Sequence, residues 1–505
     1  MKQRFWSAVY LLLVVAFLRH LASFWMPLVG FSSWIQFGNQ LNPPLRMLEQ
    51  VDFFVFDGAG YDGQFYAQLA CQPDLSNPEL KTSIDNLPYR ARRILSCWLA
   101  HWMGGGDPWW TLQAYAMQPV LAWLGLAVLL LRWYPPGSLD HALRWSLTLL
   151  GWGLLGTIYQ SVPDGLALLL MLGALMLLER GQRGGAVGLV ALASLLRETS
   201  LLALVMFWPG CGEGRRRWLR ASLEVLLAML PLGLWLAYLK WGLQLNQNAG
   251  SAAFGWPGQG WWGKLLELLA LDFGGPHRWL FVCTGLAFVG LTLQALYVLA
   301  RPHPQEQVWR LAAVHAGLML VLGQAVWEGH PGAALRVMLP LTLMFNRLVP
   351  QGKRGIALLL LGNLSCLSVL LYPRVGERPG LTFRHHLCRE VLVRPDPGWV
   401  PSRAGDGRPR MSSRRPLSEI RLVNSGKSPR HLSWHGSLRC TQGARVRWKR
   451  DGQVLWQGLV GRQEVAFELP PLRLEPGEHR LEVEVEAPPD TWLHAIGQVV
   501  EVVVP

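Results

Sequence analysis

Apolar runs follow one another up to about residue 372, and charged or Pro/Gly-rich breaks separate them. Most of these runs are close to the roughly 20 residues that an α-helix needs to cross the hydrocarbon core of a bilayer. The pattern predicts an α-helical multi-pass membrane protein with about eleven membrane segments. They are expected at residues 6–26, 111–132, 142–160, 163–179, 186–197, 199–209, 219–241, 279–300, 309–327, 333–349 and 356–372.

Basic residues in the short connections predict the orientation, because lysine and arginine collect on the cytoplasmic side. Lys2 and Arg4 precede the first segment, which has no small-residue cleavage site behind it and is expected to remain as an anchor. Segments 186–197 and 199–209 are too short to cross singly, so we expect a helical hairpin. The amino terminus is then cytoplasmic and the carboxyl terminus external. The external connections are residues 27–110, 161–162, 242–278 and 328–332.

The last part of the chain has a different pattern. Hydropathy falls after residue 372, and residues 373–416 are predicted to be a linker. Further on, Leu or Val alternates with Glu over residues 481–486, and Asp451-Gly452 is typical of a hairpin turn. These signals predict an external β-sandwich domain over residues 417–505. It would follow a transmembrane domain that covers residues 1–372.

Composition agrees with a membrane protein. Hydrophobic residues make up 51% of the chain, charged residues 16%, and the mean hydropathy is +0.22. This is too apolar for a disordered or an ordinary soluble protein. The net charge of +14 would suggest a nucleic-acid partner in a soluble protein. Here much of it lies in short loops beside apolar segments, so membrane lipids are the expected partner and nucleic acid is not.

Seven cysteines are distributed over both sides of the predicted membrane. Cys71 and Cys97 share the first external loop, and Cys388 and Cys440 share the tail. Two interpretations are open: disulfides within each pair, or unpaired cysteines that act as small hydrophobic residues. No spacing of Cys and His is typical of a metal site, and neither a metal nor a cofactor is expected.

The first external loop carries the most informative sequence. Residues 56–66 read Phe-Asp-Gly-Ala-Gly-Tyr-Asp-Gly-Gln-Phe-Tyr, which places Asp57 and Asp62 among glycines and aromatic rings. Glycine lets a backbone approach a ligand closely, and a carboxylate in such a place can act as a general base. The alternative is a turn-rich loop whose aspartates cap helices or bind water.

Several arginines occupy places where a phosphate could bind. Arg90, Arg92 and Arg93 lie in an amphipathic external segment, and an arginine fork can hold two phosphate oxygens. The alternative is contact with ordinary lipid headgroups. Arg197 and Glu198 lie at the hairpin turn, where charges are costly unless they pair with each other or contact a substrate. Arg336 is a second deep cation. Asp164, after Pro163, is expected to cap the start of a helix.

The Tyr61–Tyr66 segment resembles the Trp-Asp-x-x-Trp-Tyr type of motif in the first external loop of mannosyltransferase-like membrane proteins of the GT-C superfamily. Its Tyr-Asp-Gly-Gln-Phe-Tyr version is similar to that of a group of bacterial membrane glycosyltransferases. The resemblance extends along most of residues 1–372 and leaves out the β domain. It includes residues 86–95, 161–164 and 196–200, which read Asn-Leu-Pro-Tyr-Arg-Ala-Arg-Arg-Ile-Leu, Ser-Val-Pro-Asp and Leu-Arg-Glu-Thr-Ser.

This resemblance implies a glycosyltransferase of the cell membrane, in bacteria the inner membrane. It would transfer a sugar from a polyprenyl-phosphate donor to an acceptor on the outer face, by inverting displacement. Asp62 is then the expected base, and Asp57 is the reserve. The residues expected to bind the donor phosphate are Arg90, Arg92, Arg93, Arg197 and Arg336. Those expected to contact substrate are Tyr61, Gln64, Tyr66, Glu198, Glu328 and His330.

Two other classes of function compete with this one. A transporter or flippase of lipid-linked glycans would favour internal repeats and discontinuous central helices, and no repeat is found in the sequence. A non-catalytic subunit of a membrane assembly would use the external β domain to bind a partner. The elaborate acidic loop argues against that class.

Overall fold

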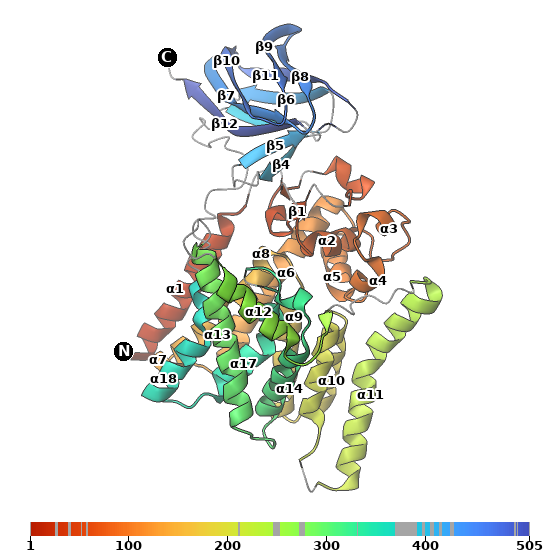
Figure 1. Cartoon of the computed structure of the whole chain (residues 1–505), viewed down its shortest axis with the longest axis vertical. Coiled ribbons are helices and arrows are strands. Elements are labelled where there is room, and N and C mark those ends of the chain that lie inside the picture. The colour runs from red at the N-terminus through yellow and green to blue at the C-terminus, as the bar shows by residue number, and fades with distance from the viewer. Residues whose placement is uncertain are drawn as a thin grey trace. The chain divides into compact units, whose positions relative to one another are not determined.

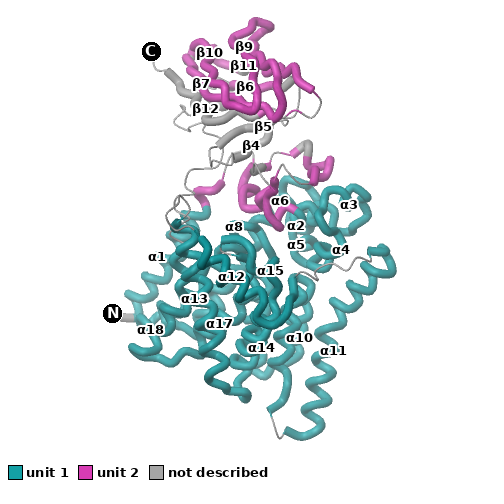
Figure 2. The backbone as a smooth tube through the Cα atoms, in the orientation of Figure 1, with its two compact units in different colours: residues 1–21, 65–374 teal, residues 22–64, 375–505 magenta. Residues whose placement is uncertain are grey.

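The structure is a computed structural model of the 505-residue chain. It describes residues 2–25, 29–38, 42–51, 53–56, 59–210, 213–245, 253–271, 278–330, 332–368, 391–395, 399–403, 409–413, 417–424, 429–488, 491 and 493–503. The chain divides into two compact units (Figure 2). Unit 1 is formed by residues 1–21 and 65–374, and unit 2 by residues 22–64 and 375–505.

Unit 1 is built from helices (Figure 1). The predicted succession of helices followed by a C-terminal β region is confirmed. The helices of the loop after the first span are α2 (Gly63–Cys71), α3 (Leu80–Ser83), α4 (Leu87–Arg90) and α5 (Leu95–Met103). The other elements of this part are α1 (Lys2–Ala22), α6 (Pro108–Leu130), α7 (Leu139–Leu149), α8 (Trp152–Tyr159), α9 (Asp164–Glu179), α10 (Arg183–Ser194), η3 (Glu198–Phe207), α11 (Arg215–Ala237), η4 (Tyr238–Gly242), α12 (Gln259–Ala270), α13 (Arg278–Ala300), α14 (Gln307–Val321), α15 (Gln324–Trp327), α16 (Ala334–Val337), α17 (Leu339–Leu348) and α18 (Lys353–Gly362).

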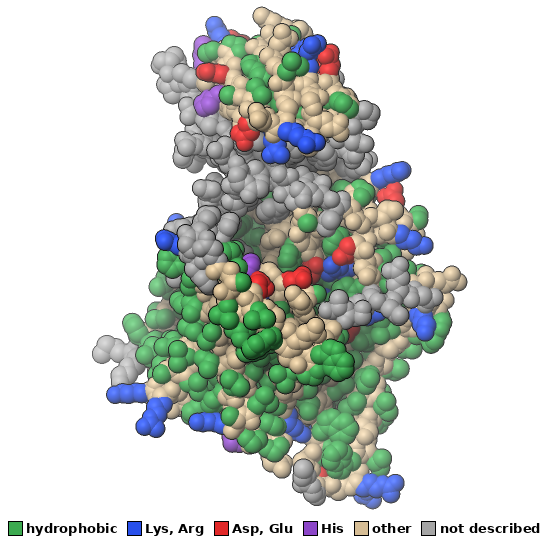
Figure 3. Space-filling view, viewed as in Figure 1, with side chains coloured by type: hydrophobic (Ala, Val, Ile, Leu, Met, Phe, Trp, Pro, Cys, Tyr) green, Lys and Arg blue, Asp and Glu red, His purple; other side chains and the backbone are tan. Residues whose placement is uncertain are grey.

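Four of the described helices are long and apolar enough to cross a membrane: α1, α6, α11 with its extension η4, and α13. The apolar helices α10, η3 and α14 are shorter. On the face shown in Figure 3, hydrophobic side chains cover the helices of unit 1, and Lys and Arg side chains gather at the lower helix ends. The total of about eleven spans stays a prediction from segment length.

Two of the predicted segments are broken in the structure. Segment 142–160 consists of α7 and α8, because the backbone leaves the helix at Gly151, with φ of −62° and ψ of 138°. The hairpin predicted at 186–197 and 199–209 consists of α10 and the 3₁₀ helix η3. Arg197 lies between them in an extended conformation, with φ of −158° and ψ of 125°. The break between α10 and η3 falls at the hairpin turn that the sequence predicts, whereas the break at Gly151 falls inside a segment predicted to be one span.

Unit 2 contains two β-sheets. The seven-stranded sheet has the order β1 (Phe37–Gly38), β2 (Val55–Phe56), β4 (Trp399–Arg403), β5 (Pro409–Ser413), β12 (Leu493–Val503), β7 (Arg430–Cys440) and β10 (Val465–Leu474). The five-stranded sheet has the order β3 (Val391–Pro395), β6 (Leu417–Asn424), β11 (Gly477–Glu486), β8 (Ala444–Arg450) and β9 (Gln453–Val460). Alternate side chains of both sheets fill one core, where the Trp434 and Trp448 rings lie 5.0 Å apart.

The loop after α1 takes part in the seven-stranded sheet. Strand β1 pairs with β2 in parallel, and β2 pairs in parallel with β4. Strands β3, β4 and β5 fall inside segment 373–416, for which the sequence predicts a linker. This segment has weak strand signals of its own, and neighbouring strands provide its hydrogen-bond partners. Such pairing between distant segments cannot be read from local sequence.

Opposite charges in the two halves of the tail meet across β8 and β11. Residues 373–450 carry 18 basic and 5 acidic residues, whereas residues 451–505 carry 3 and 10. Arg447 donates hydrogen bonds to Glu484 at 3.1 Å and to Glu486 at 2.8 Å, and Lys449 Nζ lies 2.6 Å from Glu484. The Lys449 and Arg447 hydrogen bonds hold the pKa of Glu484 below its ordinary value. The polarised tail is therefore paired within its own sheet.

Cys71 on α2 and Cys97 on α5 are buried free thiols. The sequence left open whether these two cysteines form a disulfide, and in the structure they do not. The Cys97 thiol donates to the backbone carbonyl of Tyr66 at 3.4 Å, so it helps to join α5 to α2. Cys440 is also a buried free thiol, and Cys388 lies outside the described residues.

Cys71 and Cys97 are expected to resist maleimide labelling at pH 8 in the folded protein. Burial raises the pKa of both thiols to about 12, so only about one molecule in 10⁴ carries either thiolate at that pH. Both should be labelled once the protein is unfolded in denaturant. Mass spectrometry of peptides measures each site separately. Recovery of a disulfide-linked peptide that contains both cysteines, without reductant, would contradict the assignment.

Candidate functional site

Backbone and side-chain hydrogen bonds hold the loop that carries Asp62. Tyr61 donates its N–H to the carbonyl oxygen of Gln36 at 2.9 Å. Gln64 is buried, accepts a hydrogen bond from the N–H of Gly38 at 3.0 Å and donates one to the carbonyl of Ala59 at 2.8 Å. The amide of Gln64 thus joins the loop to β1, and its predicted contact with substrate stays a prediction.

Asp62 is half-buried and directly precedes α2, which begins at Gly63. Tyr61 is half-buried as well. Asp57, the reserve base, lies outside the described residues.

Gly60→Ala is expected to disrupt this loop. Gly60 has φ of +72°, and a Cβ there would lie 2.5 Å from both the Gln36 oxygen and the Gly38 nitrogen. Gly105→Ala is the matched control, because Gly105 has φ of +62° and no described atom would lie within 4 Å of its Cβ. The left-handed backbone alone costs about 1–2 kcal/mol, so the clash should make Gly60→Ala measurably worse in thermal unfolding and limited proteolysis. Equal behaviour of the two variants would show that the loop can adjust.

Arg90, on α4, is engaged in contacts within unit 1. Its guanidinium forms two hydrogen bonds with the carboxylate of Asp85, at 3.0 and 2.7 Å. It also lies 5.0 Å from the ring centre of Phe65 and 5.4 Å from that of Tyr66. These contacts satisfy the charge of a buried arginine. Arg92 is half-exposed and forms no ion pair with a described residue.

Arg93 connects the segment between α4 and α5 to the turn between α10 and η3. Its guanidinium donates to the hydroxyls of Tyr66 and Tyr89, both at 2.8 Å, and its Nε lies 3.2 Å from a carboxylate oxygen of Glu198. Burial by itself lowers the pKa of Arg93, but Tyr66, Glu198 and Tyr89 together raise it well above its ordinary value. Arg93 is therefore a permanent buried cation, and Tyr66 serves as its acceptor.

A second group of charges lies where α9 begins. Asp164 is the first residue of α9, and its carboxylate forms ion pairs with Arg197 and, at 3.5 Å, with Arg336. The expectation that Asp164 caps a helix is wrong, because Pro163 occupies the capping position and no side chain caps the helix. Ser161 has φ of +42°, so a tight turn precedes the aspartate. Asp164 is the anion that two arginines share.

The two groups of charges belong together. Arg197 interacts electrostatically with Arg93, Arg336 and Glu198. We call these five side chains (Arg93, Arg197, Arg336, Asp164 and Glu198) the arginine cluster. Three guanidiniums and two carboxylates thus lie together. Asp164 is only 3% exposed, whereas Glu198 is 26% and Arg197 is 16% exposed, so the cluster is accessible on the Glu198 side.

Glu328 and His330 lie in a different group of residues. Glu328 is exposed, and His330 Nε2 lies 3.4 Å from Glu267. Lys264 is buried, pairs with Glu267 at 2.8 Å and donates to the carbonyl of Gly329 at 2.9 Å. Burial and then Lys264 lower the pKa of His330, which favours the neutral ring near pH 7. This arrangement ties α12 to the loop before α16.

Of the predicted phosphate-binding residues, the structure brings Arg93, Arg197 and Arg336 together. Asp62 belongs to unit 2 and these arginines belong to unit 1. Their meeting in one cavity stays a prediction.

Sequence reasoning missed Tyr89 and Lys264, and it gave Asp164 the wrong role. One signal could have indicated that Asp164 meets Arg197. The turn before Asp164 and the hairpin turn with Arg197 are both predicted to lie on the external side. In the described parts of the chain, no group of three His, Cys, Asp or Glu residues could hold a metal ion.

Together these features define a largely helical protein that has helices suited to a membrane, a β region and a buried cluster rich in arginine. A scan against models of protein families and a search of curated proteins find no match. Among solved structures, the chain is similar to the arabinosyltransferase EmbB from Mycobacterium smegmatis, with 12% identity and a TM-score of 0.32. The match covers 87% of this chain and 62% of the EmbB chain, so this chain spans less than two thirds of that protein.

Proposed function

We propose that the chain is a membrane glycosyltransferase that takes its sugar from a polyprenyl-phosphate donor. The acceptor is a glycan, lipid or protein on the external side. The observation that carries the proposal is the meeting of three guanidiniums in the arginine cluster, which is accessible at Glu198. The sequence resemblance of the Tyr61–Tyr66 loop supports the same assignment.

In the proposed reaction, Asp62 accepts the proton of the acceptor hydroxyl. The oxygen then attacks the anomeric carbon from the side opposite the donor phosphate. The bond between this carbon and the phosphate oxygen breaks, and its electron pair stays on the phosphate. Arg197 and Arg336 stabilise the negative charge that develops there, and Arg93 holds Glu198 beside them. The configuration at the anomeric carbon is inverted.

The test is sugar transfer in membranes that contain the full chain, supplied with a panel of labelled polyprenyl-phosphate sugars. One donor is expected to be used by the wild-type chain. Arg197→Gln should lower its use by about 10²-fold, the typical loss when one group that stabilises a developing anion is removed. Arg197→Lys should recover part of the rate because it keeps the charge. Arg215→Gln, in an exposed turn at the start of α11, is the control.

Two results would contradict the proposal. One is that no polyprenyl-phosphate sugar is a donor for a folded wild-type chain. The other is movement of a lipid-linked glycan across the membrane without any new glycosidic bond, which would identify a transporter. Thermal unfolding of each variant shows whether a lost activity reflects a lost fold.

A further inference from the structure

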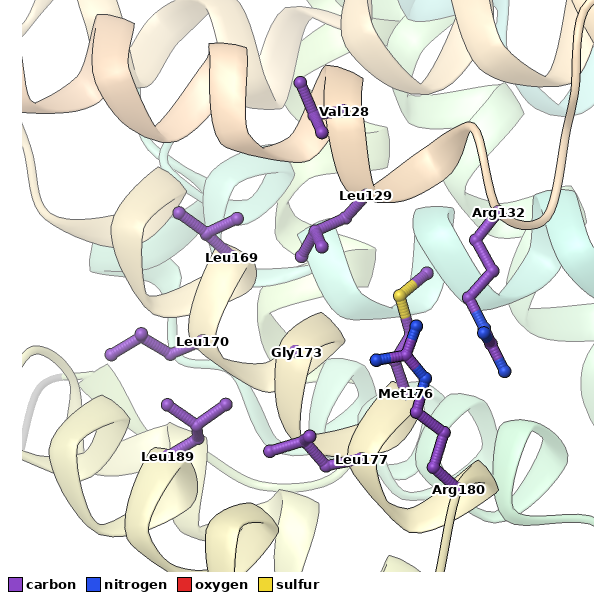
Figure 4. A pocket seen from close by; sticks show the side chains of 10 residues that line it. All are labelled: Val128, Leu129, Arg132, Leu169, Leu170, Gly173, Met176, Leu177, Arg180 and Leu189. Atoms are coloured by element: carbon purple, nitrogen blue, oxygen red, sulfur yellow. The ribbon is translucent and has the colours of Figure 1, made fainter. Parts of the chain in front are cut away.

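A groove along α6, α9 and α10 lies outside the candidate site. It has a volume of about 440 Å³, within the range of roughly 300–1,000 Å³ that is common for ligand pockets. Leu and Val side chains line it, together with Gly173 and Met176. Figure 4 shows Arg132 and Arg180 at one side of the groove, next to Met176, and Leu170 and Leu189 at the opposite side.

The two arginines differ from their neighbours in being available. Arg180 is exposed and forms no ion pair with a described residue. Arg132 is 42% exposed and has only a long contact, 3.8 Å, with Glu179. Arg183, which follows in the same turn, is by contrast held by Glu224 through hydrogen bonds of 2.8 and 3.0 Å. Arg132, Arg180 and Glu179 together give this end of the groove a net charge of about +1.

The position of this end follows from the length of α9. Asp164 of the arginine cluster is the first residue of α9, and Arg180 directly follows its last residue. A helix of 16 residues is about 24 Å long. The polar end of the groove therefore lies a helix length away from the cluster, close to the thickness of a bilayer core of about 30 Å. A lipid held there belongs to the opposite leaflet from a donor held at the cluster.

We propose that this groove binds an anionic glycerophospholipid, with an acyl chain along α6, α9 and α10 and its phosphate between Arg132 and Arg180. An apolar channel that ends in two guanidiniums matches a molecule with a hydrocarbon chain and a phosphate at its end. At Gly173 there is little room beside the groove, because a Cβ at this position would lie 3.0 Å from the Leu189 side chain. The distance from the arginine cluster favours a phospholipid over the sugar donor.

The test uses the purified full chain in detergent, titrated with phosphatidylglycerol or phosphatidylcholine, and counts bound lipids by native mass spectrometry. Wild-type protein is expected to bind phosphatidylglycerol roughly tenfold more tightly than phosphatidylcholine. Arg132→Gln with Arg180→Gln should abolish this preference. Gly173→Leu, which fills the groove, should weaken binding of both lipids. The control is Arg215→Gln with Arg216→Gln, which removes the same charge from an exposed turn.

Three outcomes would overturn the proposal. The first is an unchanged preference in the Arg132/Arg180 double variant. The second is an equal loss in the control, which would reveal a general effect of net charge. The third is displacement of phosphatidylglycerol by a polyprenyl phosphate at a lower concentration than unlabelled phosphatidylglycerol needs, which would make the groove a donor-lipid site. Retention of the wild-type unfolding temperature in Gly173→Leu separates a filled groove from a lost fold.

Discussion

Asp62→Asn is expected to lower sugar transfer by about 10²- to 10⁴-fold, the usual contribution of a general base. Asparagine is close to aspartate in size but cannot accept the proton of the acceptor hydroxyl. The loop around it is held by Gly60, Tyr61 and Gln64 through contacts that do not use the Asp62 carboxylate. Initial rates with saturating donor and the unfolding temperature are the two measurements.

Asp74→Asn is the matched control for this variant. Asp74 lies in the same loop after α1 and is exposed, and its carboxylate accepts hydrogen bonds from the backbone N–H and the hydroxyl of Ser76, at 3.3 and 2.7 Å. Its substitution should leave the rate within about twofold, as expected for a surface change. If Asp62→Asn transfers sugar at the normal rate and Asp57→Asn does not, the base is Asp57. Normal rates in both variants would remove the aspartate mechanism.

Asp164→Asn is expected to destabilise the protein by about 3–5 kcal/mol, the range found when one partner of a buried ion pair is removed. Asp164 is 3% exposed and is the shared anion of Arg197 and Arg336. Without its charge, Arg197 and Arg336 would lose the carboxylate that they share. The measurement is the unfolding midpoint in detergent, which should fall clearly.

The control is Glu213→Gln, which breaks the pair with Arg217 at 2.9 Å. The Arg217 side chain is 71% exposed, and exposed pairs contribute about 0–1 kcal/mol. The midpoint of this variant should hardly move. If Asp164→Asn were as stable as the wild type, the cluster would not need its shared anion. Partial recovery in an Asp164→Asn/Arg336→Gln double variant would show that the loss comes from uncompensated charge.

The limits of sequence reasoning are clearest at the arginine cluster. Local hydropathy identified Arg197 and Glu198 as charges between apolar pieces, and their cost in that place indicated a function. It left open whether they pair with each other. In the structure Glu198 pairs with Arg93 instead, and Arg197 pairs with Asp164. These partners come from distant segments, so no local pattern could reveal them.

The loop of Asp62, in unit 2, also shows what local sequence can predict and what it cannot. The glycines of residues 56–66 indicated a tightly folded backbone. The positive φ of Gly60 agrees with that interpretation. That the loop contributes β1 and β2 to a sheet formed by the end of the chain was not predictable. Strands of two residues are too short to give a signal of their own.

By itself, the sequence determined the properties that depend on neighbouring residues: which segments are apolar enough to form membrane helices, where strands alternate, and which charges stand in costly places. Only the tertiary structure decided which of these charges meet, that Gln64 and Arg90 are engaged within their own unit, and that Cys71 and Cys97 remain free thiols. The physical reason is the distance along the chain over which each effect acts. Hydropathy and alternation act over a few residues, whereas ion pairs, strand pairing and burial depend on segments that folding brings together.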